Sequence, residues 1–283
     1  MIKLNYNSAS TLRIFLEEEG LGMRKQFGQN FLINPSARQA LVEALDCEAG
    51  DEVWEIGPGL GAMTAMLLEK GLTVRAFEID TGFIHTLKRI FAEEKGFFLI
   101  EGDVMKTWSV QKPAQFLLGN LPYNVAAAFL ADLIEKGRLF TRMVVTVQKE
   151  VALRMTASAG SQGFSSFSVL CASAYRIKPL MLIRSSSFFP QPNVDSMGVL
   201  LENRRACAYP AVFYPLVRSL FASRRKTIKN NLTAFLASCS GKASQDICET
   251  LLRENGLTGN ERAENLELEA FLSLAKSIEN MRL

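Results

Sequence analysis

Short apolar runs alternate with longer amphipathic stretches between residues 51 and 148, and this alternation is the strongest constraint on the fold. The apolar runs, which we expect to be strands, span residues 53–56, 73–77, 97–100, 116–118 and 143–147. Between them, residues 64–70, 83–95 and 125–136 have apolar positions at the three- and four-residue spacing of helices. Strands that alternate with helices form βαβ units, so the pattern predicts a doubly wound, mostly parallel sheet.

The remainder of the chain completes this sheet and adds a second domain. Two further strand-like runs, 167–177 and 197–201, bring the expected sheet to seven strands, and Pro190 and Pro192 interrupt the chain between them. Residues 157–163 have the Ser and Gly content of a flexible loop. Residues 203–245 contain eight Lys or Arg and no Asp or Glu, at helical apolar spacing. We therefore expect a first domain over 1–203, with an N-terminal extension at 1–23, and a small basic helical domain over 204–283.

Composition narrows the class of protein. Five cysteines are scattered without a CxxC pair, which is typical of reduced thiols in the cytoplasm and predicts no metal site. The chain has neither a signal-like start nor an apolar run of the ~20 residues that a membrane span needs, so a cytoplasmic monomer is expected. His85, the only histidine, falls in an amphipathic stretch, where a surface or packing role is expected.

A glycine-rich turn, EIGPGLG at residues 55–61, follows one expected strand and opens a helix. Glycines allow a tight turn and close approach of the backbone to a ligand. A dinucleotide site has wider glycine spacing and helix amides that face phosphates. Here Glu55 precedes the turn, and we expect its carboxylate at the mouth of the site. There it would repel phosphates and suit the sulfonium and ammonium of S-adenosylmethionine, which favours methyl transfer over hydride transfer.

Two acids at strand ends support this interpretation. Glu78 ends the second strand about 20 residues after the turn, where a carboxylate can accept both ribose hydroxyls. Asp103 follows the third strand and is placed to accept from the adenine amino group. An isolated glycine turn often only joins a strand to a helix, and a single acid is commonly a surface or capping residue. Their combination favours a cofactor site.

The fourth strand ends in NLPY, residues 120–123, at the sheet edge where open α/β folds bind ligands. An exocyclic amino group on an aromatic ring is a poor nucleophile because its lone pair is delocalised. The Asn120 side chain and the Leu121 carbonyl can accept its two hydrogens and draw the nitrogen toward tetrahedral geometry. Pro122 adds no competing N–H donor, and Tyr123 can stack on the base. Catalysis would then rest on positioning and on exclusion of water.

With these motifs the chain resembles the KsgA-type ribosomal RNA adenine dimethyltransferases, from about residue 24 to residue 268. The resemblance implies an α/β, Rossmann-like class I methyltransferase fold, with a mostly parallel seven-stranded sheet and a small C-terminal helical domain. Residues 25–32, KQFGQNFL, resemble the family segment that wraps over the cofactor. Cofactor contacts are implied at Asn30, Leu32, Gly57, Glu78, Asp103 and Asn120.

The resemblance also implies a second stacking aromatic. Phe188, in SFFPQPNVDS at residues 187–196, matches that position and would sandwich a flipped adenine with Tyr123. Phe189 is the alternative in a register shifted by one, and either ring can instead be a core residue. One departure from the family is GFSSFS at 163–168, where relatives carry a Tyr-Gly pair.

A cluster of cations predicts contact with nucleic acid. The segment FASRRKTIKNNL, residues 221–232, has helical apolar spacing and carries Arg224, Arg225, Lys226 and Lys229. Such residues bind phosphates without sequence preference, while a splayed-out base receives the chemistry. A lone basic run is more typical of a solvated helix face, but the absence of acids across 203–245 favours RNA.

The family's target is a pair of adjacent adenines in a loop near the 3′ end of 16S small-subunit RNA, accepted within a pre-ribosomal 30S particle. The resemblance therefore implies transfer of methyl groups from S-adenosylmethionine to adenine N6, giving N6,N6-dimethyladenosine. Two alternatives stay open at this point. One is an Erm-type enzyme that methylates large-subunit RNA, and the other is a non-catalytic ribosome assembly factor.

Overall fold

The computed structural model describes residues 4–22, 29–122, 125–204, 209–240 and 245–281. The chain divides into two compact units. Unit 1 comprises Met1–Leu133, Arg138–Ala152 and Ile177–Asn203, and unit 2 comprises Ile134–Gly137, Leu153–Arg176 and Arg204–Leu283. The chain thus crosses between the units several times, and Leu153–Arg176 belongs to the same unit as the C-terminal helices.

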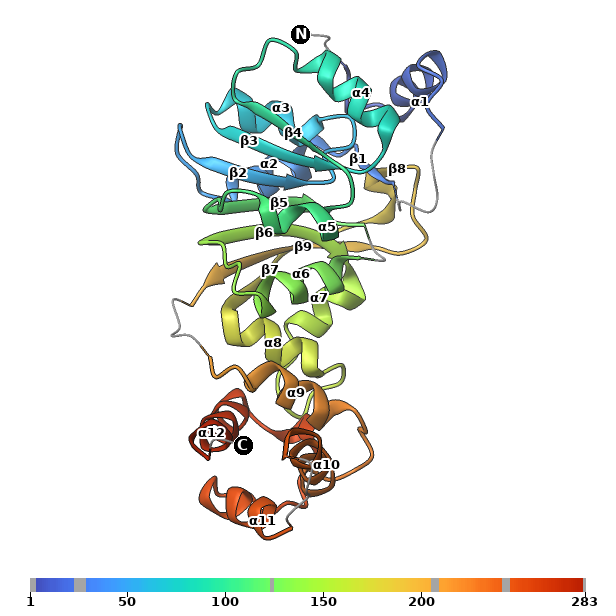
Figure 1. Cartoon of the computed structure of the whole chain (residues 1–283). Helices are drawn as coiled ribbons and strands as arrows, with labels where there is room; N and C mark the ends of the chain where they lie inside the picture. Colours follow the sequence, from blue (N-terminus) through green and yellow to red (C-terminus); the bar gives the residue numbers. More distant parts are fainter. Residues whose placement is uncertain (1–3, 23–28, 123–124, 205–208, 241–244, 282–283) are drawn as a thin grey trace. The chain divides into compact units, whose positions relative to one another are not determined.

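A seven-stranded sheet forms the centre of unit 1 (Figure 1). Its order is β4 (Phe97–Glu101), β3 (Thr73–Glu78), β2 (Glu52–Ile56), β5 (Phe116–Asn120), β6 (Arg142–Gln148), β9 (Ser196–Asn203) and β7 (Tyr175–Ile183). The strands β4 to β6 pair in parallel, whereas β9 runs antiparallel to β6. The predicted mostly parallel seven-stranded sheet is confirmed, and each of its first five strands lies within two residues of its expected bounds.

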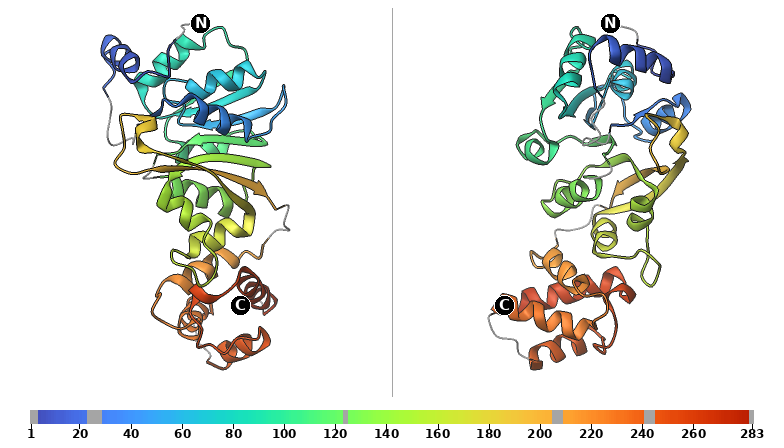
Figure 2. Two further views of the ribbon diagram at one scale, coloured as in Figure 1. Left: turned by 180° about the vertical axis from the view of Figure 1, so that it is seen from behind. Right: turned by 90° about the vertical axis from the view of Figure 1, so that its right-hand side faces the viewer.

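Helices cover both faces of the sheet (Figure 2). Right-handed crossovers place α3 (Ala62–Glu69) and α4 (Thr81–Ile90) on one face as the chain runs from β2 to β4. From β5 to β6 the chain runs the opposite way, so α6 (Ala126–Glu135) lies on the other face. The helix α2 (Pro35–Glu43) packs beside α3 in a core that includes Leu41, Leu67 and Val74. The short helix α5 (Val104–Thr107) follows β4, and α7 (Lys149–Met155) follows β6.

The N-terminal residues add elements outside the main sheet. The helix α1 (Ala9–Glu18) is capped by Ser8, whose hydroxyl accepts from the Thr11 amide. The strand β1 (Phe31–Leu32) pairs antiparallel with β8 (Phe188–Phe189), and this two-residue ladder joins segments that are more than 150 positions apart. No local pattern in the sequence predicts such a pairing.

The strand expected over residues 167–177 is wrong for most of its length. Residues Ser166–Ala174 form α8, and extended structure begins only at Tyr175. Ser165 and Ser168 form a capping box at the start of α8, with the Ser165 amide 3.1 Å from Ser168 Oγ. Nearly every residue of α8 is buried, so it lacks the polar face that distinguishes a helix from a buried strand by periodicity.

Unit 2 is helical. Besides α8 it contains α9 (Phe213–Phe221), α10 (Ile228–Ser240), α11 (Gln245–Glu254) and α12 (Leu268–Asn280), whose buried side chains form one core. The segment 157–163, expected to be a flexible loop, is tied to this unit, because the Gly160 amide donates to the Glu264 carbonyl at 2.7 Å. Within the described part of the chain, none of the helices has the length and apolar character that crossing a membrane requires.

Candidate cofactor and substrate site

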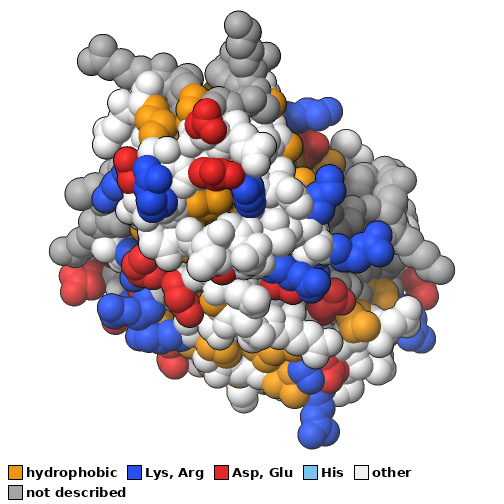
Figure 3. All heavy atoms as spheres, turned by 90° about the horizontal axis from the view of Figure 1, so that it is seen from below, with side chains coloured by type: hydrophobic (Ala, Val, Ile, Leu, Met, Phe, Trp, Pro, Cys, Tyr) orange, Lys and Arg blue, Asp and Glu red, His pale blue; other side chains and the backbone are white. Residues whose placement is uncertain are grey.

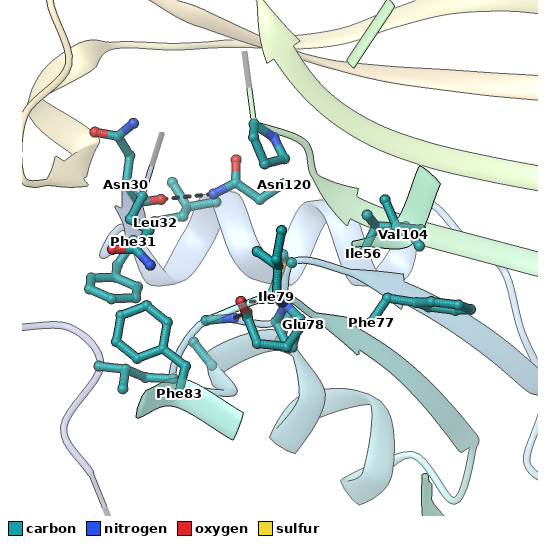
Figure 4. A pocket seen from close by; sticks show the side chains of 18 of the residues that line it. Asn30, Phe31, Leu32, Ile56, Phe77, Glu78, Ile79, Phe83, Val104 and Asn120 are labelled. Carbon is teal, nitrogen blue, oxygen red and sulfur yellow. Dashed lines mark hydrogen bonds between the residues drawn. The ribbon is translucent and has the colours of Figure 1, made fainter. Parts of the chain in front are cut away.

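A cavity of about 330 Å³ opens in unit 1 where the parallel strands end. This is the edge at which open α/β sheets bind their ligands. Its wall includes all six positions for which cofactor contacts were predicted: Asn30, Leu32, Gly57, Glu78, Asp103 and Asn120. They come from five separate segments, and Figure 4 shows several of them converging on the cavity.

The glycine-rich turn between β2 and α3 requires glycine for geometric reasons. Gly57, Gly59 and Gly61 have φ of +69°, +59° and +86°, a region that other residues rarely adopt. A Cβ on Gly59 would lie 2.9 Å from the Phe31 ring, and a Cβ on Gly61 would lie 2.5 Å from the Phe91 ring. The turn therefore combines a left-handed backbone with close packing, and it lets the backbone itself form a wall of the cavity.

Glu78 is held firmly at the end of β3. Its Oε1 accepts from the amides of Ile79 and Asp80, both at 2.9 Å, and its Oε2 accepts from the Gly59 amide at 3.2 Å. Burial raises the pKa of Glu78 to about 7, and the hydrogen bonds from the three backbone amides counteract that rise. A carboxylate fixed in this way presents its remaining lone pairs to the cavity, as recognition of two vicinal hydroxyls requires.

Glu55 does not lie at the mouth of the site, and this prediction is wrong. Its side chain is fully buried, Oε2 accepts from Thr64 Oγ1 at 2.6 Å, and Oε1 has no partner among the described residues. Burial raises the pKa of Glu55 to about 7, with the charge of Glu78 as a further contribution. Side chains alternate along a strand, so Ile56 and not Glu55 reaches the cavity wall.

Asn120 connects the end of β5 to the N-terminal signature segment. Its Nδ2 donates to the Asn30 carbonyl at 2.8 Å, and in Figure 4 its side-chain oxygen points away from Asn30. That oxygen is the acceptor which the catalytic interpretation needs. Pro122 also lines the cavity, whereas the Leu121 side chain is buried in the core. Tyr123 lies outside the described residues.

Asp103 lies in the cavity wall, whereas Phe188 and Phe189 do not. Asp103 lines the cavity and also caps α5, because its Oδ1 accepts from the Met105 amide at 3.0 Å. The Phe188 side chain is buried with Leu32 in the main core and does not line the cavity. Phe189 packs instead against the cluster around α1. In this conformation neither ring is exposed in the cavity, and stacking by Phe188 stays a prediction.

Several residues of the cavity wall are not among the contacts that the sequence predicted. Tyr6 and Leu12 come from the N-terminal extension, and Arg38 comes from α2. Arg38 is only 5% exposed, which is unusual for an arginine that has no carboxylate partner among the described residues. Tyr6 donates to the Leu60 carbonyl at 3.0 Å, and burial raises the pKa of its hydroxyl to about 12. The sequence predicted no helix over residues 35–43, so no local pattern identified Arg38.

The predicted RNA-binding cations lie in unit 2, but not on one continuous helix. Residues 222–227 form the turn between α9 and α10, so of these cations only Lys229 is helical. Arg224 donates to the Phe164 carbonyl at 3.0 Å and lies 3.5 Å from Glu264, and Lys229 pairs with Glu249 at 2.8 Å. Arg225 and Lys226 are exposed. On the face seen in Figure 3, Lys and Arg side chains lie among Asp and Glu side chains rather than in one uninterrupted patch.

Comparisons with known proteins identify the family of this chain. The family model described as ribosomal RNA adenine dimethylase matches residues 20–280. A Treponema denticola protein named ribosomal RNA small subunit methyltransferase A is 46% identical over 284 residues, which cover 97% of this chain and 96% of that protein. A Borreliella afzelii protein of the same name is 37% identical over 281 residues, which cover 98% and 96%.

Two solved structures share the fold of this chain. A dimethyladenosine transferase from Plasmodium falciparum superposes with a TM-score of 0.77 at 25% identity, over 88% of this chain and 98% of that one. The 23S rRNA methyltransferase ErmE shares the fold, with a TM-score of 0.65 at 20% identity over 88% of this chain and 99% of that one. The resemblance that the motifs predicted is confirmed, and this chain belongs to the ribosomal RNA adenine dimethylase family.

Proposed function

We propose that this enzyme transfers methyl groups from S-adenosylmethionine to the N6 amino groups of two adjacent adenines in a loop near the 3′ end of 16S RNA. The product would be N6,N6-dimethyladenosine, formed in the cytoplasm by a monomer that acts on a pre-ribosomal 30S particle. The observation that carries the proposal is that one cavity gathers the six predicted cofactor contacts and has Asn120 in its wall. The small-subunit names of the relatives favour this target over large-subunit RNA.

The described residues fit S-adenosylmethionine. A cavity of about 330 Å³ is within the range of sites for small ligands. Glu78 would accept the ribose hydroxyls, Asp103 the adenine amino group, and the Gly57 backbone would allow close approach of the amino acid end. When bound, the cofactor supplies an electrophilic methyl group on a cationic sulfur.

The chain's own residues would prepare the target nitrogen. The Asn120 side-chain oxygen and the Leu121 carbonyl accept the two amino hydrogens, which localises the lone pair on nitrogen. Stacking of the adenine by Tyr123, and by Phe188 after a change of its side-chain position, would hold the ring in line with the methyl group. Extrusion of the base costs a few kcal/mol, and the cost is lowest for a nucleotide in a loop.

We assign contact with the RNA backbone to unit 2, through Arg224, Arg225, Lys226 and Lys229. The two cations without a described ion pair, Arg225 and Lys226, are exposed on a turn and can reach phosphates without first breaking an ion pair. Arg224 and Lys229 would have to exchange Glu264 and Glu249 for phosphate.

The test is transfer of labelled methyl groups to immature small subunits and, separately, to large-subunit RNA, followed by nucleoside analysis. N6,N6-dimethyladenosine in the small-subunit RNA alone is the expected result. Label in large-subunit RNA would instead favour an Erm-type activity. Binding of particle and cofactor without any transfer would move the assignment to an assembly factor.

A further inference from the structure

The described part of the N-terminal extension, residues 4–22, forms a wall of the cofactor cavity, and we call it the N-terminal arm. Tyr6 and Leu12 of the arm line the cavity. The Tyr6 hydroxyl donates to the Leu60 carbonyl in the glycine-rich turn, and Leu12 is buried against Leu60 and Phe83. The arm is thus built into the site rather than appended to it.

Arg38 holds the arm in place. Its Nη1 donates to the Leu32 carbonyl at 2.5 Å and to the Tyr6 carbonyl at 3.3 Å, and its Nη2 donates to Asn7 Oδ1. One guanidinium therefore joins the arm, at Tyr6 and Asn7, to Leu32 on the opposite side of the same wall. Removal of Arg38 would leave the arm's backbone near Tyr6 without this support.

None of the residues that the structure describes neutralises the charge of Arg38. No carboxylate of the described residues lies within 4.0 Å of it, and Nε is buried without a partner. Among the described residues that line the cavity, Arg38 is the only cation, whereas Glu78 and Asp103 are acids. A buried charge is strongly unfavourable unless it meets an opposite charge. The cavity wall therefore offers no negative charge to Arg38, and a ligand with an anionic group can supply it.

The position of Arg38 in the cavity identifies the part of the ligand that it meets. Glu78 and Asp103, which would hold the ribose and the adenine, follow β3 and β4. Arg38 lies beside Leu32 and Tyr6, and Tyr6 in turn contacts the turn that follows β2. In the strand order β4-β3-β2-β5, this is the end of the site away from the adenine.

We propose that Arg38 fixes the N-terminal arm as the wall around the amino acid end of S-adenosylmethionine and presents its guanidinium to the cofactor's carboxylate. This inference rests on the proposed cofactor. It gives Arg38 two connected effects, one on the position of Tyr6 and one on recognition of a negative charge.

The test compares two ligands that differ only in the carboxylate, S-adenosylmethionine and its decarboxylated form, by calorimetric titration. We expect the native protein to bind S-adenosylmethionine at least ~10-fold more tightly, as is typical of a charged hydrogen bond. Arg38→Met should remove most of this ratio, and the smaller loss of affinity for the decarboxylated ligand measures the loss of the arm's support. Arg142→Met is the matched control, because Arg142 pairs with Asp46 and Glu202 and does not line the cavity.

The outcomes separate the two proposals. If the native protein binds neither ligand, the cofactor assignment fails. If it binds both and Arg38→Met weakens both equally, Arg38 has only a structural role and the inference is overturned. Arg38→Lys keeps the charge in a smaller head group and serves if the methionine variant does not fold. The lysine variant should still prefer the carboxylate ligand, and equal affinity for both ligands would also overturn the inference.

Discussion

The buried carboxyl of Glu55 should make the stability of the protein fall as the pH rises, and Glu55→Gln should remove that fall. Glu55 is fully buried, has one hydroxyl donor and leaves Oε1 without a described partner. Its pKa rises from 4.5 to about 7 in the folded chain. Between pH 4.5 and pH 7 the folded chain holds a proton that the unfolded chain has released. The contribution of Glu55 to stability is therefore fully present below pH 4.5 and is lost as the pH rises through 7.

The magnitude follows from the shift. Each pKa unit corresponds to about 1.4 kcal/mol, so the ionised carboxyl lowers the free energy of unfolding by about 3 kcal/mol once the pH exceeds 7. Urea unfolding of the native protein and of Glu55→Gln, without ligand, measures this directly. The free energy of unfolding of the variant minus that of the native protein should increase by about 2 to 3 kcal/mol between pH 5 and pH 8. Glu78 titrates in both proteins, so its own contribution largely cancels.

A second variant tests the cause. The Thr64 hydroxyl lowers the pKa of Glu55 by donating to its charged form, so Thr64→Val should raise that pKa further and extend the loss of stability to higher pH. A difference between native protein and Glu55→Gln that stays constant from pH 5 to pH 8 would refute the reasoning, because it would mean that Glu55 is ionised over the whole range.

Three other perturbations test the site and unit 2. Asn120→Ala should lower the rate of methyl transfer by ~100-fold or more, as loss of one positioned polar contact does in other enzymes. Its affinity for S-adenosylhomocysteine should fall by at most ~10-fold, and full turnover would exclude a catalytic role for Asn120. Gly61→Ala should destabilise the fold by about 2 to 4 kcal/mol through backbone strain and a clash with an aromatic ring. Gly160→Ala, also at positive φ but in open space, should destabilise it by only about 1 kcal/mol. Equal losses of stability in denaturant unfolding would show that the clash has no effect. Replacing Arg225 and Lys226 by Ala should weaken RNA binding and lower the dependence of log affinity on log salt by about 2, and an unchanged salt slope would exclude phosphate contacts.

The positions of Glu78, Asp103 and Asn120 show how much of the site local sequence predicts. Each follows an apolar run that the alternation identifies as a parallel strand, and parallel strands end at one edge of the sheet. Predicting the strands therefore predicted the meeting of these side chains. The position of Glu55 was predicted wrongly, because it depends on the side-chain direction at the last residues of β2, which the sequence of a buried strand does not reveal.

The helix α8 illustrates a second limit. Its residues are apolar or small throughout, and a run buried on all sides has no polar face from which a period can be read. Burial there comes from α9 and α12, which are distant in sequence. Ser165 and Ser168, which form the capping box, are a local signal that could have identified the helix.

The sequence by itself determined the fold class, the residue ranges of the parallel strands, the glycine-rich turn and the family. These depend on local periodicity and on motifs whose members are close in sequence. Only the tertiary structure decided that Tyr6 and Arg38 form part of the cavity, that Phe188 is buried with Leu32, and that Arg224 and Lys229 have acidic partners. Each of these is a contact between distant segments, and such contacts depend on how whole elements pack, which no local pattern encodes.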